Sequence, residues 1–459
     1  MNQMSTALQK LKHIFVARET SWIEKIELVC TIGIIFSIFF PIKYVLENHL
    51  STLLGYYSDF TAISIYLSFF LILILLGVQF SKDIKIREQK FLYLKIFIAI
   101  LLSIILYQLN VNPSLKIVSL YQLLRISCVL LLGYYVYKSN IWLKYKGLLL
   151  WIFIFVGSIQ SIIALTQFTL QHSIGINLLG ESPLAISTYG VAKIVSHGTT
   201  FIRGYGTLPH PNILSALLVI SSLLNLHLLN NALHKYQRVI LSVSFFLITM
   251  GVFVSFSRAG LLAFAIGLTT WGVVTLFRKK SFLIMRKVLI VPISIIISSL
   301  IFMPWLLTRA NIQDQASTER SVYNHAGVEI LKNNWVIGTG PGTNLFHMKQ
   351  KLENQLEEWN IQPIHNYWLI TVAEWGIIGL FIVFFFVYTL LRFIRSIVGN
   401  DYSKSNQKIT CWQTTLLSIF IVILTLFWFD HYFYTIWPTQ MMLWIVIGLI
   451  WQSIVPRET

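Results

Sequence analysis

The sequence is poor in charged residues and in cysteine. Only 12% of its 459 residues are Asp, Glu, Lys or Arg, whereas soluble domains contain about 25%. A soluble fold of this length would need a far larger polar surface, so the composition argues against one. The three cysteines, Cys30, Cys128 and Cys411, lie far apart and inside apolar segments. This placement argues against a disulfide framework and against a zinc site built from cysteine.

Acidic residues are scarce even among the charged ones, with 18 Asp and Glu against 35 Lys and Arg and a net charge of +17. In a soluble protein this excess would suggest a nucleic-acid partner. Here many basic residues lie in short loops between apolar segments, where they set the orientation of membrane helices. We therefore expect no nucleic-acid partner. The loops predicted to face outward contain no Asp-x-Asp motif and no cluster of metal ligands, so we expect no metal and no cofactor.

The sequence is rich in long apolar segments. Hydrophobic residues make up 56% of the chain, and the mean hydropathy is +0.70. A helix needs about 20 apolar residues to cross the hydrocarbon of a bilayer, and open strands cannot satisfy their backbone there. The sequence predicts an all-α polytopic membrane protein of about twelve transmembrane helices, near residues 26–47, 60–80, 93–109, 117–137, 147–170, 210–230, 238–256, 259–277, 288–307, 365–391, 411–430 and 437–454.

The basic loops predict the orientation of these helices. Residues 82–90 and 278–287 are rich in Lys and Arg, whereas residues 48–60 contain neither. The positive-inside rule places the basic loops in the cytoplasm. Residues 1–25 are polar and basic and carry no cleavable signal pattern, so we interpret the apolar run that follows as an uncleaved first span. Both termini are then cytoplasmic.

Two of the predicted outer segments, 171–209 and 308–364, are too long to be simple connections. The second contains the turn Gly-Thr-Gly-Pro-Gly at 338–342 and an amphipathic pattern over 343–359. We therefore predict a large extracytoplasmic loop with a helix at the membrane surface. The turn follows no strand and faces outward, so we interpret it as a flexible turn and not as a dinucleotide-binding motif.

Two groups of polar residues lie at predicted helix ends. Arg203, His210 and Asn212 surround the start of the sixth span, and they could form a polar mouth that binds sugar or phosphate. The alternative is a Gly/Pro turn followed by an ordinary helix start. Arg258, in Ser-Phe-Ser-Arg-Ala-Gly, lies at the outer membrane boundary. A charge at this depth is costly and often functional, although the side chain could also extend to the lipid headgroups.

Two further groups lie in and after the large loop. Arg320 is either a functional cation or a solvated loop residue. His365 and Asn366 open the tenth span, where a histidine is either a proton acceptor with an ordinary pKa near 6.5 or a simple interfacial residue. Glu374 lies deep in the same span and Arg125 deep in the fourth. Because each charge alone would be expensive in the membrane, we expect the two to pair or to share a polar cavity.

Together these groups resemble motifs of the O-antigen ligase and Wzy-type polymerase superfamily. The likeness covers about residues 200–380, in the order G-T-L-P-H-P-N at 206–212, S-F-S-R-A-G at 255–260, I-G-T-G-P-G-T-N-L-F at 337–346 and H-N-Y-W-L-I-T-V-A-E-W-G-I-I-G-L at 365–380. No single motif is specific, but four occur in order, each at a fitting place in the predicted topology. The first 170 residues match only in the general pattern of spans.

The resemblance implies a membrane glycosyltransferase of the GT-C type that is metal-independent and inverting. Its donor would be a saccharide on a polyprenyl diphosphate, and its acceptor lipid A core, a growing polysaccharide or a protein. It would act in contact with membrane lipids. The family's two key arginines and its histidine correspond to Arg258, Arg320 and His365, as catalytic residues. We place five further residues in substrate binding: Arg203, His210, Asn212, Asn366 and Glu374.

The likeness divides the chain into N-terminal helices (1–200), a ligase-like core (201–392) that includes the large loop 308–364, and C-terminal helices (393–459). Other classes of protein remain open. A transporter or a flippase for lipid-linked saccharides would also have many spans and intramembrane charges, although such proteins often show internal repeats and midplane sites. A structural partner in a polysaccharide assembly complex would not need Arg258, Arg320 or His365.

Overall fold

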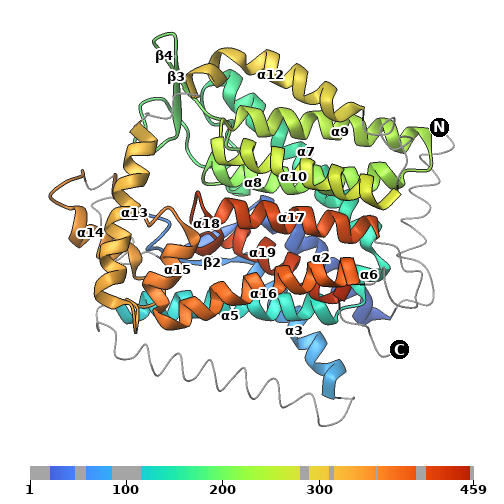
Figure 1. Cartoon of the computed structure of the whole chain (residues 1–459), viewed down its shortest axis with the longest axis horizontal. Helices are drawn as coiled ribbons and strands as arrows, with labels where there is room; N and C mark the ends of the chain where they lie inside the picture. Colours follow the sequence, from blue (N-terminus) through green and yellow to red (C-terminus); the bar gives the residue numbers. More distant parts are fainter. Residues whose placement is uncertain are drawn as a thin grey trace.

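A computed structural model describes residues 21–46, 58–84, 115–279, 289–309, 315–357, 360–399 and 410–454. These residues are mostly helical, and the long helices run side by side along one direction (Figure 1). The two described hairpins and most of the described irregular chain lie toward one end of the bundle. The predicted class of an all-α polytopic membrane protein is therefore supported.

Seven described helices are long and apolar enough to cross a membrane: α5 (Lys116–Lys138), α7 (Lys146–Leu170), α8 (Pro211–Asn231), α9 (Lys235–Val254), α10 (Arg258–Lys279), α12 (Ile290–Arg309) and α16 (Ile377–Gly399). Four further helices are shorter or less apolar: α2 (Trp22–Phe39), α3 (Leu67–Ile84), α17 (Cys411–Phe427) and α19 (Trp437–Ile454). The structure thus does not reproduce twelve spans, and the predicted span at 93–109 lies outside the described residues.

The prediction that every membrane segment is purely helical is wrong for the first two predicted segments, which each contain a short strand. The segment predicted as helical over 26–47 leaves the helix at Phe39, and strand β1 (Lys43–Leu46) pairs antiparallel with β2 (Ile63–Tyr66) before α3 begins. Pro41 disfavours a helical conformation for the residue before it, which ends the helix. A second hairpin, β3 (Lys193–Ser196) and β4 (Thr199–Ile202), lies in the first long outer segment.

The segment predicted as one span over 365–391 is two helices, α15 (Tyr367–Trp375) and α16. The break is at Gly376, whose φ of 57° is unfavourable for residues with a side chain. The turn at 338–342 packs against this break, where the Thr339 and Gly340 amides donate to the carbonyls of Ala373 and Glu374, both at 3.0 Å. The turn is therefore a fixed support for α15, and the expectation of a flexible turn is wrong.

Gly338→Ala will destabilise this support. Gly338 has a φ of 76°, and an added Cβ would lie 2.2 Å from the Glu374 carbonyl oxygen. A strained backbone of this kind costs about 1–3 kcal/mol before any clash is counted. We expect thermal unfolding in detergent to shift down by several degrees. Gly147→Ala is the control, because a Cβ there meets nothing within 4 Å; equal melting temperatures for the two variants would contradict the assigned role.

The large outer loop contains two helices, α13 (Gln315–Asn334) and α14 (Asn344–Leu352). The predicted amphipathic helix over 343–359 is thus shorter than expected, ending at Leu352. Its apolar side is buried as the pattern predicts, with Leu345, Met348 and Leu352 each at most 2% exposed. Both helices lie at the same end of the bundle as α15 and the short helix α18 (Tyr432–Thr435), which places the loop beside the polar residues of that end (Figure 1).

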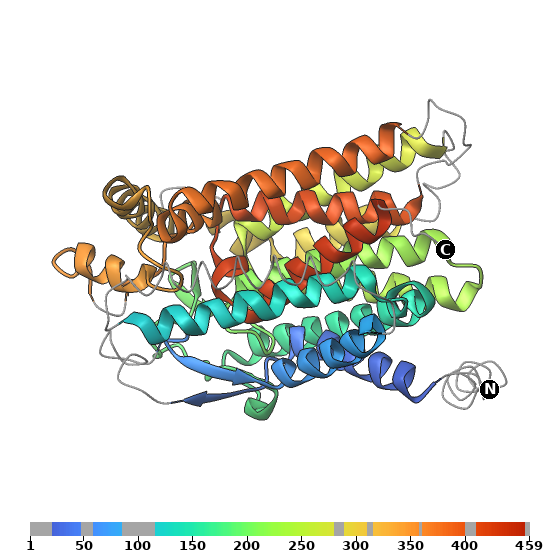
Figure 2. The ribbon, with the colours of Figure 1, turned by 90° about the horizontal axis from the view of Figure 1, so that it is seen from below.

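The start of the first described helix and the end of the last lie at the opposite end of the bundle (Figure 2). Glu24 of α2 forms an ion pair with Lys144 at 2.6 Å. Gln452 of α19 donates to the carbonyls of Val136 and Ser139, which lie at the end of α5. An even number of membrane crossings between these two helix ends would produce this arrangement.

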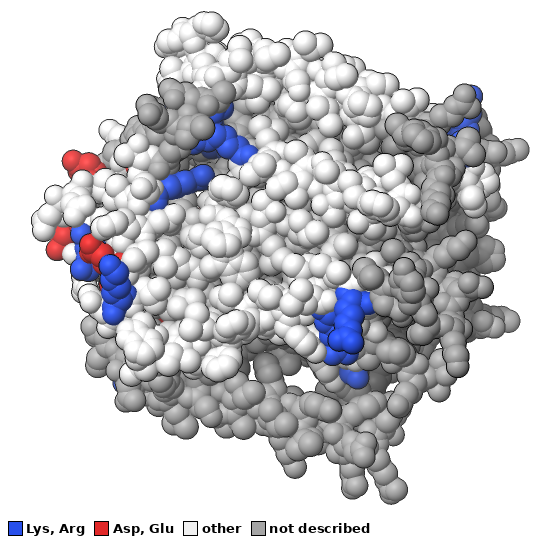
Figure 3. Space-filling model, viewed as in Figure 1, with Lys and Arg blue, Asp and Glu red and all other residues white. Residues whose placement is uncertain are grey.

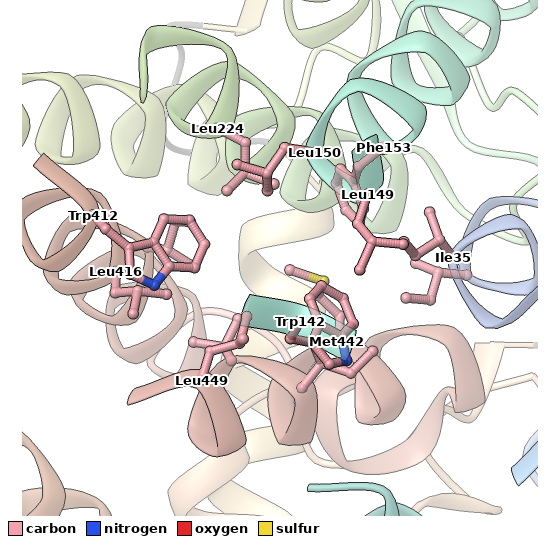
Figure 4. Close-up of a pocket in the computed structure, with 14 residues that line it drawn as sticks. Ile35, Trp142, Leu149, Leu150, Phe153, Leu224, Trp412, Leu416, Met442 and Leu449 are labelled. Atoms are coloured by element: carbon pink, nitrogen blue, oxygen red, sulfur yellow. The ribbon is translucent and has the colours of Figure 1, made fainter. Parts of the chain in front are cut away.

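The face of the molecule seen in Figure 3 is nearly free of charge along the helices. Between α2, α7, α8, α17, α19 and the short helix α6 (Ile141–Lys144), the packing leaves a small void of about 20 Å³ (Figure 4). The side chains around it are almost entirely apolar, among them Leu150, Phe153 and Met442. A void of this size holds at most one water and an apolar one stays dry, so we assign it to packing and not to function.

Candidate functional site

The centre of the candidate site is a buried carboxylate, Asp430, which the sequence motifs did not include. It follows α17 and precedes α18, and it is 6% exposed. Its Oδ2 accepts a hydrogen bond from Asn212 Nδ2 at 2.9 Å and lies 3.7 Å from an Arg320 nitrogen. Its Oδ1 accepts from the backbone N–H of His431 at 2.9 Å. Asp430 therefore joins residues from the sixth predicted span, the large loop and the C-terminal helices.

Arg203 extends this network on the far side of Asn212. Its Nε donates to the carbonyl of Ser255 at 2.6 Å, and one terminal nitrogen donates to Asn212 Oδ1 at 2.8 Å. Arg203 is 4% exposed. Its burial, with repulsion from neighbouring arginines, lowers its pKa to about 9, so the side chain stays charged at neutral pH. Arg203 thus connects Ser255 of the motif at 255–260 with Asn212 of the motif at 206–212. Asn212 in turn binds Asp430, so the hydrogen bonds form a chain from Arg203 to Asp430.

His365 lies just before α15, with a defined tautomer. Its Nδ1 is 2.9 Å from the carbonyl oxygen of Pro363, and only a protonated Nδ1 can donate there. The Nε2 atom therefore carries a free lone pair. The ring stacks on Tyr323 at 5.1 Å and meets the edge of His431 at 4.8 Å. Burial and the neighbouring His431 lower the pKa of His365 to about 3, so the ring is neutral at physiological pH.

Arg258 is the first residue of α10, directly after a tight turn in which Phe256 has a φ of 46°. Arg309, at the end of α12, donates to the carbonyl of Phe256 at 3.4 Å. Arg258, Arg309 and Arg320 are each partly exposed, and basic side chains gather between α13 and the adjoining ends of α10 and α12 (Figure 3). These arginines and the buried Arg203 form what we call the arginine cluster. The sequence motifs did not include Arg309.

A cavity of about 410 Å³ adjoins the buried network. His210, His365, Asp430 and His431 form part of its wall. The rest comes from the segments around 58–60, 182–184 and 188–191, with Tyr205, Pro209, Ile213, Gln362, Tyr432 and Ile436. The first long outer segment and the residues before β2 thus complete a site whose chemistry lies in the ligase-like core and the C-terminal helices.

A second cavity of about 500 Å³ continues from the first. The two share Asp59, Ser182, Pro183, Pro209 and Ile436 in their walls. Lys43 and Asp59 form an ion pair at 2.5 Å beside it. The two cavities are therefore adjacent, the first lined by His365 and the second by residues of the first hairpin.

The remaining predicted site residues have structural contacts. His210 is the N-cap of α8, where its Nδ1 accepts from the backbone N–H of Asn212 at 3.2 Å while the ring lines the cavity. Asn366 is the N-cap of α15 and accepts from Leu369 N at 3.0 Å. It therefore fixes the start of the helix directly after His365. The structure does not place Asn366 in the wall of either cavity.

Glu374 is 1% exposed and lies away from both cavities. Its carboxylate accepts from the backbone N–H groups of Gly342 and Asn344 and from the Tyr434 hydroxyl. Arg125 donates to the carbonyl of Thr435 at 2.8 Å. The expected direct pair between Glu374 and Arg125 is therefore wrong, because each binds a different residue of α18. Together they hold α18, and with it the adjoining Asp430 and His431.

Residues 243–384 match the family model described as O-antigen ligase. No curated protein matches the chain. The matched segment contains Arg258, Arg320 and His365, whereas Arg203, Asn212 and Asp430 lie outside it. The fold is that of a polytopic helical membrane protein, and the candidate site lies at one end of its bundle. The matched segment confirms the resemblance to the O-antigen ligase and Wzy superfamily, and supports, at the level of the family, a membrane enzyme of the ligase or glycosyltransferase kind.

Proposed function

We propose that this protein transfers a saccharide from a polyprenyl diphosphate to an acceptor hydroxyl on the extracytoplasmic face of the bacterial inner membrane. The product would be that of an O-antigen ligase or a polysaccharide polymerase. The observation that carries the proposal is the placement of His365. This residue lies in the wall of the large cavity with its Nε2 unprotonated, and Arg320 lies beside the neighbouring Asp430. Both termini would lie in the cytoplasm.

The arginine cluster suits a diphosphate leaving group. A departing diphosphate is a stable anion that needs charge neutralisation more than a proton. Arginine supplies a permanent charge and paired donors that match phosphate oxygens. Because Arg258, Arg309 and Arg320 are partly exposed and basic side chains border a face with few charges (Figure 3), a lipid-linked diphosphate could reach them from the membrane. Donors aimed at developing negative charge typically contribute about 3–4 kcal/mol each.

His365 suits the role of general base. The acceptor oxygen would form a bond to the anomeric carbon while the bond from that carbon to the phosphate oxygen breaks. The electron pair of the broken bond would leave with the polyprenyl diphosphate, and the acceptor's proton would pass to His365 Nε2. A single displacement inverts the anomeric carbon. No step in this scheme uses a metal ion, in agreement with the implied mechanism.

The two cavities suit the acceptor, because His365 lies in the wall of the first and no member of the arginine cluster lies in the wall of either. Their walls carry hydroxyls, Asp59, Lys43 and the rings of Tyr66 and Tyr189. Sugars bind to such walls through hydrogen bonds and contacts with aromatic faces. The N-terminal hairpin, which lies outside the segment that matches the family, would then help select the acceptor.

Asp59→Ala will weaken acceptor binding with little effect on the chemical step. A hydrogen bond to a charged group is worth about 1.5–3 kcal/mol, so the KM for the acceptor should rise by about tenfold or more while kcat and the KM for the donor change less. Steady-state kinetics with a fixed saturating donor measure this. Glu353→Ala, on the exposed end of α14, is the control. A change in the KM for the donor alone would show that Asp59 contributes to donor binding and not to acceptor binding.

The flippase and transporter alternative rested on the many spans and on charges deep in the membrane. The contacts of Arg125 and Glu374 favour a structural role for these two charges, because each residue binds α18. Neither residue lines a described cavity.

The function can be tested in detergent, where no bilayer separates two faces. The purified protein is incubated with a polyprenyl-diphosphate oligosaccharide, candidate acceptors and EDTA. A transferase will release free polyprenyl diphosphate and form an elongated acceptor with an inverted anomeric linkage. A flippase will do neither. Absence of release with lipid A core, polysaccharide and peptide acceptors alike would contradict the proposed function.

A further inference from the structure

Three side chains that border the large cavity bring possible ligand atoms together. One ring nitrogen of His365, one of His431 and one carboxylate oxygen of Asp430 all lie within 4.8 Å of one another. His431 Nε2 lies 3.9 Å from Asp430 Oδ1. All three residues are at least nine-tenths buried. The ring packing of His365 and His431 brings the two imidazoles together, but it does not require a carboxylate oxygen to lie beside both of them.

The hydrogen bonds of both imidazoles are compatible with the tautomer that a metal ligand needs. His365 Nδ1 donates to the Pro363 carbonyl at 2.9 Å. His431 Nδ1 lies 2.8 Å from Thr435 Oγ1, a hydroxyl that can accept from the ring while its own hydrogen points to the His431 carbonyl at 3.4 Å. With these hydrogen bonds both Nε2 atoms are unprotonated, as in metal-binding histidines whose other nitrogen is held by a hydrogen bond.

The carboxylate is oriented in the same way. Asn212 and Arg320 occupy Oδ2 of Asp430. Oδ1 accepts only the backbone N–H of His431, and it keeps a second lone pair on the side of the His431 ring. Ligating carboxylates in metal sites are commonly held by hydrogen bonds of this kind. The hydrogen-bond network thus orients all three donor atoms before any ion arrives.

We propose that His365, Asp430 and His431 form a binding site for a divalent metal ion of the Zn²⁺ type, and that the bound ion inhibits saccharide transfer. Two imidazoles and one carboxylate suit zinc, whereas magnesium and calcium prefer oxygen ligands. Tetrahedral bonds of about 2.1 Å place ligand atoms about 3.4 Å apart, so side-chain shifts of about 1 Å would close the site. The adjoining cavity leaves the fourth position open to water.

The inhibition follows from coordination of His365 Nε2 by the metal ion. Zinc would bind the Nε2 lone pair of His365, which the proposed transfer uses to accept a proton. The ion would also draw Asp430 away from Arg320, 3.7 Å distant. This second part of the inference rests on the proposed function, whereas metal binding itself does not.

Metal binding is tested on the purified full-length chain, without an affinity tag and after treatment with EDTA. Titration calorimetry with Zn²⁺ should show one site, and the affinity should fall at least tenfold in His431→Gln. His172→Gln, an exposed histidine of the first long outer segment, should bind zinc like the wild type. Zinc-edge X-ray absorption of the wild type should show two imidazole ligands. No saturable site, or one whose affinity is equal in His431→Gln and wild type, would overturn the proposal.

Inhibition is tested separately. Zinc at concentrations that fill the site should abolish transfer, and an excess of EDTA should restore it. If zinc binds with the expected ligands and transfer continues unchanged, the inhibitory role is wrong although the site stands. If no transfer occurs even without zinc, the proposed function fails, and the calorimetry still decides the metal site.

Discussion

His365→Ala will lower the rate of saccharide transfer by about 10²–10⁴-fold, the usual contribution of a positioned general base. The Nδ1 hydrogen bond to Pro363 and the stacking on Tyr323 hold the ring so that Nε2 is free to accept the proton. Alanine removes the proton acceptor and leaves the arginine cluster in place. The loss should therefore appear in kcat, with little change in the KM for the donor. Initial rates of product formation measure both.

His325→Ala is the matched control for this variant. His325 lies in the same large loop, but its side chain is 79% exposed and contacts Glu329 at the surface. It should retain the wild-type rate. A His365→Ala variant that folds normally and transfers at a rate within twofold of the wild type would remove His365 from the mechanism.

Asp430→Ala will have the second large effect, on both stability and rate. The substitution leaves Arg320 and Asn212 without the carboxylate oxygen that they share. Removing one partner of a fully buried ion pair typically costs about 3–5 kcal/mol, and the cost here should be smaller because the Arg320 side chain is 27% exposed. Arg320 and Asn212 are then free to shift, and the arginine cluster loses its alignment with the cavity. We expect a lower melting temperature and a rate reduced by at least about 10²-fold, the usual effect of losing one anion-stabilising donor.

Asp430→Asn separates the charge from the shape. Asparagine keeps the size of the side chain and one oxygen acceptor, but it removes the negative charge that faces Arg320. Its melting temperature should lie between those of the wild type and Asp430→Ala. Thermal unfolding in detergent and initial rates test the series together. Wild-type stability and rate in Asp430→Ala would show that the carboxylate does not organise the site.

Much of the helical framework could be predicted from local sequence. The apolar run at 147–170 corresponds to α7 (Lys146–Leu170), and the run at 210–230 corresponds to α8 (Pro211–Asn231). Both patterns work because hydrophobic length and, in α8, an N-terminal proline are local properties. The break at Gly376 is different, because it depends on the turn at 338–342 that packs against it. An apolar run continues through the break, so the pattern predicts one helix.

The site could be predicted only in part, for a related reason. Arg203 and His365 stood out as polar residues near the ends of apolar segments, and Arg320 stood out as a charge in the large loop. Their connection through Asp430 could not be predicted, because the hydrogen bond between Asn212 and Asp430 joins residues that are 218 positions apart in the sequence. The signal that was present is the Asp430-His431 pair in the short connection between two apolar runs. Glu374 likewise appeared as an isolated intramembrane charge. Its partners include backbone N–H groups, which the amino-acid types in the sequence do not reveal.

The measurement that tests the central claim most directly compares transfer by the wild type with that by Arg258→Ala, Arg320→Ala and His365→Ala. Each protein is purified in detergent, shown to melt like the wild type, and assayed in EDTA with the same polyprenyl-diphosphate oligosaccharide and acceptor. We predict transfer by the wild type and its near loss in all three variants. Wild-type transfer that all three variants retain would mean that the site is wrongly assigned, and transfer that EDTA abolishes would contradict the metal-independent mechanism.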